Sequence, residues 1–352
     1  MTTPDKKQLR FGILATGNIA RQFADGVQSG ATHSTITAVA SRTQQSADNF
    51  AKTYCIPQAH SQYNALLTDP NVDAVYIALP NNMHHEWTIR ALNAGKHVLC
   101  EKPIAVNAEQ AAEMFQVAES QGLLLAEAYM YLTHPLTQSL VDELHAQTIG
   151  PVKMVRSSFS FAVGNPDNNS RFSTELAGGA LMDIGCYCVT LALLVADTIT
   201  SPGTYPSQIQ CAAHLHPSGV DDYASVSLRF PNDLIASFVC GMSSQMNNIS
   251  FISGRDGYIE IPIPWKPPME NAVFHIGQNI TPKQDQHSDT KPRAVLQNHT
   301  TTVSADKPLY ALEADAFAAA VFGKQPLFIT PDFSLRTIRI LDALRSQAGL
   351  CF

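Results

Sequence analysis

The chain has 352 residues, of which 45% are hydrophobic and 15% are charged, and its formal net charge at pH 7 is -7. This length allows two domains of ordinary size, each with a substantial hydrophobic core. The acidic balance argues against nucleic acid or an anionic membrane as the main partner, because both attract a basic protein face.

Neither the N-terminus nor the longest apolar stretch indicates a membrane protein. Residues 1–10 contain no apolar run of the kind that signal peptides have. The apolar stretch at 186–196 is shorter than the roughly 20 residues that span a bilayer. The cysteines form no Cys-x-x-Cys pair and the histidines no His-Glu-x-x-His motif. The sequence therefore predicts a soluble, cytoplasmic protein that binds no metal ion.

The first third of the chain alternates between short apolar strands and helical segments. Strands are predicted at 9–15, 35–41, 72–80, 97–103 and 123–131. Helices are predicted between them at 18–29, 43–54, 86–96 and 108–122. Such alternation predicts a parallel sheet that is covered by helices on both faces.

The turn after the first predicted strand is similar to a Gly-x-Gly-x-x-Gly/Ala dinucleotide-binding loop, with Ala15, Gly17 and Ala20 at its three small positions. Gly17 would let the backbone approach a pyrophosphate. Ala15 fits only in an ordinary backbone conformation, because alanine disfavours a positive φ. A tight turn in any α/β protein is the alternative. The position between strand and helix favours a dinucleotide held by Ala15, Thr16, Gly17, Asn18 and Ile19.

The end of the second predicted strand bears on the choice between NADP and NAD. NAD sites usually have an acidic residue about 20 residues after the loop, where it binds the ribose 2′-hydroxyl. Ser41 and Arg42 stand there instead, and they could hold the 2′-phosphate of NADP. We therefore expect NADP, with NAD as the second choice. The structural alternative is a solvated Arg42.

After about residue 130 the pattern changes to strands in which apolar and polar residues alternate. These are predicted at 151–162, 207–216, 222–230, 234–244, 248–254 and 257–262. A long helix at 179–196 interrupts them, and helices at 310–323 and 332–347 end the chain. Residues 262–295, rich in proline and polar side chains, are predicted to form a long surface loop. The result is an α/β chain with a second, largely antiparallel sheet that has one open face.

Five segments read GILATGNIA at 12–20, IALPNNMHHEW at 77–87, AGKHVLCEKP at 94–103, EAYMY at 127–131 and GGALMDIGCY at 178–187. Together they resemble the glucose-fructose oxidoreductase / inositol dehydrogenase family, Gfo/Idh/MocA, and most of all its D-xylose dehydrogenase and dimeric dihydrodiol dehydrogenase branch. The resemblance implies an N-terminal Rossmann domain at 1–128. It also implies an α/β domain at 129–352 for substrate binding and oligomerisation, whose last helices pack back on the first domain. NAD(P) would bind the first domain, with the substrate in the cleft between the two.

The resemblance also implies a catalytic set. Glu101-Lys102-Pro103 matches the motif of the family's catalytic lysine, and Pro103 biases Lys102 toward an extended backbone at a strand end. Asp183 and Tyr187, four residues apart on one helix face, match its substrate-facing pair. We expect Tyr187 to exchange a proton with the substrate, Lys102 to lower the tyrosine pKa, and Asp183 to orient Lys102 or a substrate hydroxyl. A surface lysine, a capping aspartate and a packed tyrosine are the structural alternatives.

Further positions are assigned by resemblance alone. Cofactor contacts are implied for Leu79, Pro80, Asn81, His84 and Glu101, and also for Lys102. Substrate contacts are implied for Tyr129, His134 and Arg171. Many relatives have arginine at the position of Leu132, so their substrate choice does not transfer directly to this chain.

The sequence thus predicts an NADP-dependent oxidoreductase acting on a hydroxyl or carbonyl of a sugar, cyclic polyol or dihydrodiol. Aldose oxidation, dihydrodiol oxidation and reduction of an anhydro- or keto-sugar all stay open. The alternative is a non-catalytic NADP sensor or regulatory protein on the same scaffold. The presence of both Lys102 and Tyr187 favours the enzyme. An open sheet face needs a cover, so we expect a homodimer or a higher homo-oligomer.

Overall fold

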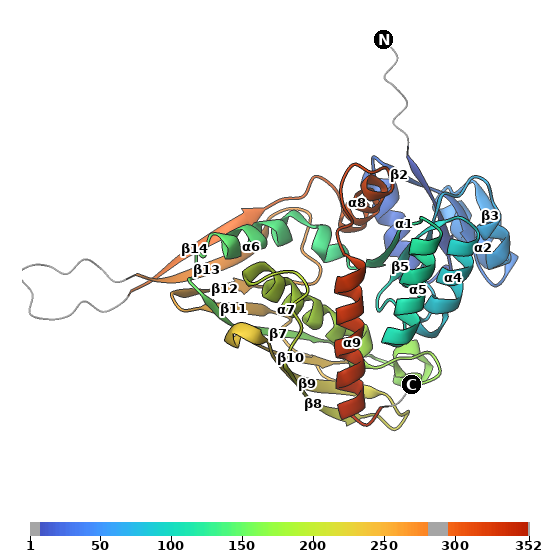
Figure 1. Ribbon diagram of the computed structural model, residues 1–352. Coiled ribbons are helices and arrows are strands. Elements are labelled where there is room, and N and C mark those ends of the chain that lie inside the picture. Colours follow the sequence, from blue (N-terminus) through green and yellow to red (C-terminus); the bar gives the residue numbers. More distant parts are fainter. Residues whose placement is uncertain (1–7, 281–294, 351–352) are drawn as a thin grey trace, which may run out of the picture.

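The computed structural model describes residues 8–280 and 295–350 (Figure 1). Its first sheet has the strand order β3-β2-β1-β4-β5-β6. The strands are β1 (Leu9–Leu14), β2 (Ser34–Ala40), β3 (Gln58–His60), β4 (Ala74–Ile77), β5 (His97–Glu101) and β6 (Leu125–Ala128). All neighbouring strands pair in parallel, as the alternating sequence pattern predicts.

Helices connect these strands, and local side chains determine where several of them begin. They are α1 (Asn18–Gly30), α2 (Gln44–Thr53), α3 (Tyr63–Leu67), α4 (His84–Asn93) and α5 (Ala108–Ser120). The side chain of Thr43 accepts from the Ser46 N–H at the start of α2, and that of Asn107 accepts from the Gln110 N–H at the start of α5. The sequence analysis missed β3 and α3, which are too short to show a period.

The second sheet, in the order β14-β13-β12-β11-β7-β10-β9-β8, is antiparallel except between β7 and β10. Its strands are β7 (Val152–Ser160), β8 (Gln208–Leu215), β9 (Asp221–Arg229), β10 (Ile235–Gly241), β11 (Ser250–Gly254), β12 (Gly257–Ile261), β13 (Ala272–Ile280) and β14 (Val295–Val303). The predicted loop at 262–295 is therefore wrong for β13, whose buried Phe274 and Ile276 alternate with partly exposed residues. The proline-rich residues before β13 concealed this alternation, and residues 281–294 lie outside the described residues.

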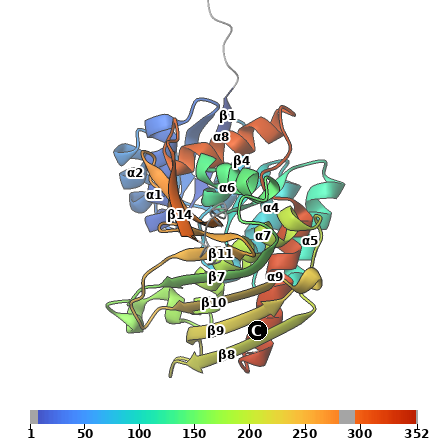
Figure 2. The same ribbon diagram turned by 90° about the vertical axis from the view of Figure 1, so that its left-hand side faces the viewer.

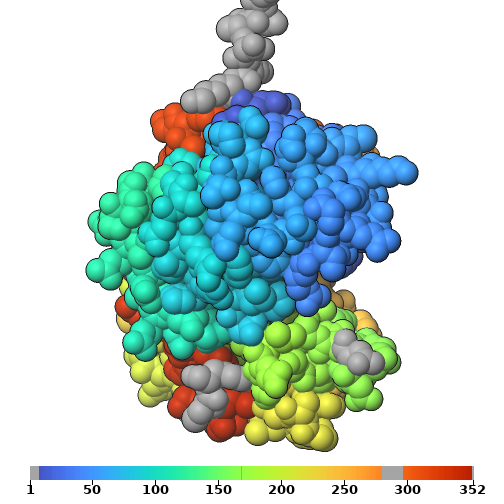
Figure 3. All heavy atoms as spheres, turned by 90° about the vertical axis from the view of Figure 1, so that its right-hand side faces the viewer, coloured from blue at the N-terminus to red at the C-terminus, as the bar shows by residue number. Residues whose placement is uncertain are grey.

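Helices cover one face of the second sheet and leave the other face open (Figures 1 and 2). The covering helices are α6 (Pro135–His145), α7 (Cys186–Ile199) and α9 (Pro331–Gln347). On the open face, Met154, Tyr223 and Ile235 are exposed. Figure 3 shows the blue and cyan atoms of the first sheet and its helices above the green, yellow and red atoms of the second part.

The long helix of the second part begins as a π-helical turn, Leu181–Gly185, and continues as α7. The run Leu181–Ile199 has 19 residues and a mean hydropathy of 1.6, so it is longer than the apolar stretch suggested and could span a membrane by length and composition. However, 72% of it is buried inside the protein. It is the core helix between α6, α9 and the second sheet.

The chain returns to the first sheet near its end, where α8 (Leu309–Val321) packs against α1. The Asp315 carboxylate accepts the backbone N–H groups of Thr32 and His33, both at 2.8 Å, and lies 2.7 Å from the Lys307 ammonium. A side chain at Gly26 of α1 would collide with Tyr310, so this close packing requires a glycine. The domain boundary after residue 128 stays a prediction.

The loop after β1 differs from expectation at Ala15, which adopts a φ of 85°. The sequence analysis required an ordinary backbone conformation there, and that expectation is wrong. The tight turn between β1 and α1 needs a left-handed residue, and alanine occupies that position at a cost of about 1 kcal/mol.

Ala15→Gly should therefore raise the free energy of unfolding by about 0.5–1 kcal/mol, because glycine removes the steric cost of a positive φ. Urea unfolding without cofactor measures the change. Ala20→Gly, inside α1, is the matched control and should lower stability instead. A loss of stability in Ala15→Gly would contradict the strain at this position.

Candidate active site

Lys102 follows β5 at the carboxyl edge of the first sheet, and its peptide bond to Pro103 is cis. The side chain is 12% exposed. Its ammonium donates to the Asp183 carboxylate at 3.0 Å and to the Asp183 backbone carbonyl at 2.6 Å. Burial disfavours the charge, but Asp183, Cys186 and Glu101 together raise the pKa of Lys102, so the amine stays protonated.

Asp183 lies in the π-helical turn and joins two cations. One carboxylate oxygen accepts from Lys102, and the other accepts from Arg171 Nε at 2.6 Å. Burial alone would raise the pKa of Asp183, yet Lys102 and Arg171 lower it below its ordinary value. The carboxylate is therefore ionised and fixed from both sides.

Tyr187 lies in the first turn of α7, one helical turn beyond Asp183. The Lys102 ammonium lies 5.1 Å from the centroid of its ring. The Tyr187 hydroxyl donates to the Met130 sulfur at 3.6 Å. Aromatic rings surround it, with centroids 5.3–6.0 Å away, from Tyr129, Tyr131, Phe159 and Trp265. The structure thus brings the three residues of the expected catalytic set together.

The expected lowering of the Tyr187 pKa is not found. Burial among these rings raises the pKa well above its ordinary value, and nearby Glu101 adds to the effect. Lys102 lies over the face of the ring, and its charge is largely offset by Asp183. The phenol is therefore protonated at neutral pH, and its hydroxyl donates to the Met130 sulfur.

The first turn of α1 is open to a ligand. Gly17 is its N-cap, and among the described residues no side chain caps the helix. Apart from Gly17 and its two chain neighbours, no described atom lies within 4 Å of where a Gly17 Cβ would be. The N–H groups of Asn18 and Ile19 thus lack a side-chain acceptor, as a phosphate-binding helix start requires. Thr16 Oγ1 lies 3.4 Å from Ser41 Oγ. Arg42 beside it is exposed and has no ion pair within residues 8–280 and 295–350.

Other residues assigned to the cofactor shape the edge of the first sheet. Glu101 is buried, accepts from the Tyr76 hydroxyl and from the Lys102 N–H, and has a pKa raised by burial. Asn81, between Pro80 and the start of α4, donates to the Ala177 carbonyl at 2.9 Å and so links the two parts of the chain. Leu79 is buried.

Three assigned residues are buried instead of lining an open site. Both ring nitrogens of His84 lie against backbone carbonyls, of Pro103 at 2.8 Å and of Leu79 at 2.9 Å. Tyr129 is fully buried against Tyr187. His134 is buried and caps α6 by accepting the Leu136 N–H. These residues hold the site in place, and a single sequence does not distinguish that role from ligand contact.

Sequence reasoning missed Lys266. Its ammonium donates to Gln22 Oε1 in α1 at 3.0 Å, and the Tyr310 hydroxyl donates to the same oxygen at 3.2 Å. The signal was a Trp-Lys pair between prolines in the segment taken for a loop.

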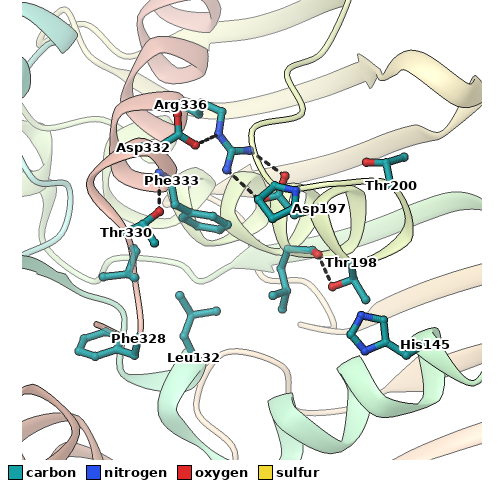
Figure 4. Close-up of a pocket in the computed structure, with 13 residues that line it drawn as sticks. Leu132, His145, Asp197, Thr198, Thr200, Phe328, Thr330, Asp332, Phe333 and Arg336 are labelled. Atoms are coloured by element: carbon teal, nitrogen blue, oxygen red, sulfur yellow. Dashed lines mark hydrogen bonds and ion pairs between the residues drawn. The ribbon is translucent and has the colours of Figure 1, made fainter. Parts of the chain in front are cut away.

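A cavity of about 500 Å³ lies away from this site, between α6, the end of α7 and the start of α9 (Figure 4). Asp197, at its edge, is ten residues beyond Tyr187, or roughly 15 Å along the helix. The Arg336 guanidinium points to Asp197 and donates to both of its carboxylate oxygens, at 2.7 and 3.0 Å. Its Nε donates to the Asp332 carboxylate at 2.7 Å. The pair with Asp197 fastens α7 to α9, so these charges stabilise the packing of the two helices at a distance from Lys102.

Asp221 of β9 fixes the start of the helical run that carries Asp183. Its carboxylate accepts the Leu181 N–H at 2.6 Å, and its other oxygen fills the space where Gly179 has no side chain. Burial raises the pKa of Asp221 to about 7. In the described part of the chain, no group of three His, Cys, Asp or Glu side chains could hold a metal ion.

Two family models match most of the chain. The one described as "Oxidoreductase family, NAD-binding Rossmann fold" matches residues 9–129, and the GFO/IDH/MocA C-terminal domain matches residues 137–260. D-xylose 1-dehydrogenase (NADP(+)) 2 of Haloferax volcanii is 32% identical over 342 residues, 97% of each chain. Trans-1,2-dihydrobenzene-1,2-diol dehydrogenase of Mus musculus is 35% identical over 260 residues, 74% of this chain and 76% of the relative.

A solved structure shares the whole architecture. It is a 3-ketoreductase of Actinomadura kijaniata in complex with NADP and TDP-benzene. It has a TM-score of 0.81 and 28% sequence identity, over 97% of this chain and 98% of its own.

Asp221 should make stability depend on pH. The native state keeps its proton up to about pH 7, whereas the unfolded chain loses it near the ordinary value of 3.8, so stability falls as pH rises between these values. Asp221→Asn lacks this dependence. Relative to the unmodified protein, it should gain on the order of 2 kcal/mol in free energy of unfolding between pH 5 and pH 8.

Urea unfolding at both pH values measures this gain. Glu119→Gln, at an exposed position of α5, is the control and should keep the pH dependence of the unmodified protein. Parallel pH profiles for Asp221→Asn and the unmodified protein would show that Asp221 is not buried as a neutral acid.

Proposed function

The chain is an NAD(P)-dependent oxidoreductase of the Gfo/Idh/MocA family, and on that premise we propose that it transfers hydride between NADP and a sugar, cyclic polyol or dihydrodiol. The observation that carries this proposal is the contact of Lys102 with Asp183 and with the Tyr187 ring, at the carboxyl edge of the Rossmann sheet. Open α/β sheets bind their ligands at that edge.

NADP fits the described residues. The uncapped first turn of α1 provides backbone N–H groups for a pyrophosphate, and Gly17 leaves room for a close approach. The exposed Arg42, unpaired among the described side chains, is available for a 2′-phosphate next to Ser41. When bound, the nicotinamide supplies or accepts the hydride.

The protein's own residues handle the proton. Tyr187 is protonated, so in the reductive direction it donates its proton to the substrate oxygen as hydride arrives on the carbonyl carbon. In the oxidative direction, Tyr187 must first lose its proton to solvent, and the phenolate then accepts the proton of the substrate hydroxyl. Lys102 positions the substrate oxygen, and Asp183 holds the Lys102 amine by two contacts. Lys102, fixed beside the phenol, favours the negative charge that develops on Tyr187 as the proton leaves.

The relatives and the rim of the site support the proposed substrate class. The curated relatives are named for a dihydrodiol and for D-xylose, and both are ring compounds with adjacent oxygen substituents. The solved 3-ketoreductase holds TDP-benzene. Arg171, 42% exposed and fixed on Asp183, presents its remaining N–H groups to such oxygens.

We propose that the open face of the second sheet, with Met154 and Ile235, is covered in a homodimer or higher homo-oligomer.

NADPH absorbance across aldoses, polyols, dihydrodiols and keto-sugars tests this function. At least one class should change the absorbance. Tight NADPH binding with no turnover of any class would favour the non-catalytic sensor on the same scaffold.

Tyr187→Phe should lower kcat by roughly 10²–10⁴-fold while NADPH affinity stays nearly unchanged, because the variant loses only the transferable proton. Steady-state kinetics and NADPH fluorescence titration measure the two effects. Tyr258→Phe, on a partly buried tyrosine of β12, is the control. Full activity in Tyr187→Phe would reject the assigned role.

Arg42→Asp should raise the Michaelis constant for NADP roughly 10- to 100-fold and leave that for NAD almost unchanged, because it removes a charged partner of the 2′-phosphate. The control is Arg339→Asp, at an exposed position of α9, which makes the same change of charge far along the chain from Arg42 and should leave both constants unchanged. An unaltered ratio of the two constants would mean that Arg42 does not select NADP.

A further inference from the structure

Lys266 connects the two parts of the molecule through one short segment between β12 and β13. Its neighbour Trp265 is buried, stacks on Phe159 with centroids 5.6 Å apart, and donates to the Ser158 carbonyl at 2.9 Å. Lys266 reaches the opposite way, to Gln22 of α1. The segment is thus fixed on the second sheet while its lysine contacts the first.

Gln22 places this ammonium close to the dinucleotide loop. Its side-chain oxygen is held by the Tyr310 hydroxyl of α8 while it accepts from Lys266. Gln22 lies four residues after Asn18, the first residue of α1, which is roughly 6 Å along the helix axis. The residue that the Lys266 ammonium contacts therefore lies about one helical turn from the uncapped N–H groups of Asn18 and Ile19.

The charge of Lys266 is not neutralised within the described residues. Lys102 and Arg171 share the Asp183 carboxylate, but within residues 8–280 and 295–350 the hydrogen-bond partner of Lys266 is a neutral amide, that of Gln22. Burial and then the repulsion by Lys102 lower the pKa of Lys266, with Arg171 adding to the repulsion. Glu101 and Asp183 act in the opposite direction and do not outweigh them.

We propose that Lys266 is a phosphate-binding residue, which exchanges its contact with Gln22 for a phosphate group bound at the start of α1. This inference rests on the proposed use of NADP. The cofactor pyrophosphate is the source that the location favours, because the loop at Gly17 is the predicted pyrophosphate site. A phosphate carried by the substrate is the second source, since Lys266 lies within electrostatic range of Lys102 and Arg171.

The role has a structural consequence. A phosphate bound at once by α1 and by Lys266 ties the Trp265 segment of the second part to the first sheet. Trp265 in turn contacts the ring of Tyr187, with centroids 6.0 Å apart. Cofactor binding would therefore fix one wall of the aromatic cage around the proton donor.

Fluorescence titration with NADPH at low and moderate salt, on the full chain, tests the proposal. Lys266→Gln should weaken NADPH binding about tenfold and flatten its salt dependence, because one charged contact to phosphate is lost. Lys266→Arg should restore most of the affinity. Lys153→Gln, at an exposed position of β7, is the matched control and should bind as the unmodified protein does.

Calorimetric titration of the NADPH-saturated protein with thymidine diphosphate separates the two sources. If Lys266→Gln binds NADPH more weakly and thymidine diphosphate equally well, Lys266 binds the cofactor phosphate. If only the binding of thymidine diphosphate is weaker, Lys266 binds a phosphate of the substrate. Equal affinities of all variants for both probes would overturn the proposal. An unmodified protein that fails to bind NADPH would instead reject the proposed cofactor, which is a different result from equal variants.

Discussion

The candidate site depends on one buried carboxylate, that of Asp183, which binds Lys102 on one oxygen and Arg171 on the other. Lys102 comes from the edge of the first sheet and Arg171 from the second part of the chain. A buried charge is stable only when it is paired, so this carboxylate requires both parts to meet in one arrangement. The position of Tyr187 follows, since it lies one turn further along the same helix.

The aromatic cage gives the phenol its chemical character. Tyr187 resembles a packed core residue by exposure, and its high pKa comes from that burial. The aromatic rings that hold the Tyr187 phenol in place therefore also keep it protonated, because they bury it. The Lys102 ammonium lies over the Tyr187 ring, yet it does not ionise the phenol.

Local patterns in the sequence predicted the regular elements well, because strand and helix periods are visible within ten residues. The parallel order around β1 and the strands β7 to β12 followed from them. Features set by distant contacts did not: Ala15 is held at positive φ by its turn, His84 is clamped between two carbonyls, and Lys266 meets Gln22 across the fold. The motifs placed Lys102 and Asp183 side by side, but only coordinates revealed that burial dominates the pKa of Tyr187.

The docking of α8 on α1 has a consequence for how the protein is made. A ribosome synthesises Asp315 283 residues after Thr32, yet the Asp315 side chain holds Thr32 and His33 just before β2. The face of α1 at Gly26 stays uncovered until Tyr310 has been synthesised. The nascent first sheet therefore emerges with an unprotected flank, and it completes its burial only once α8 has left the ribosome.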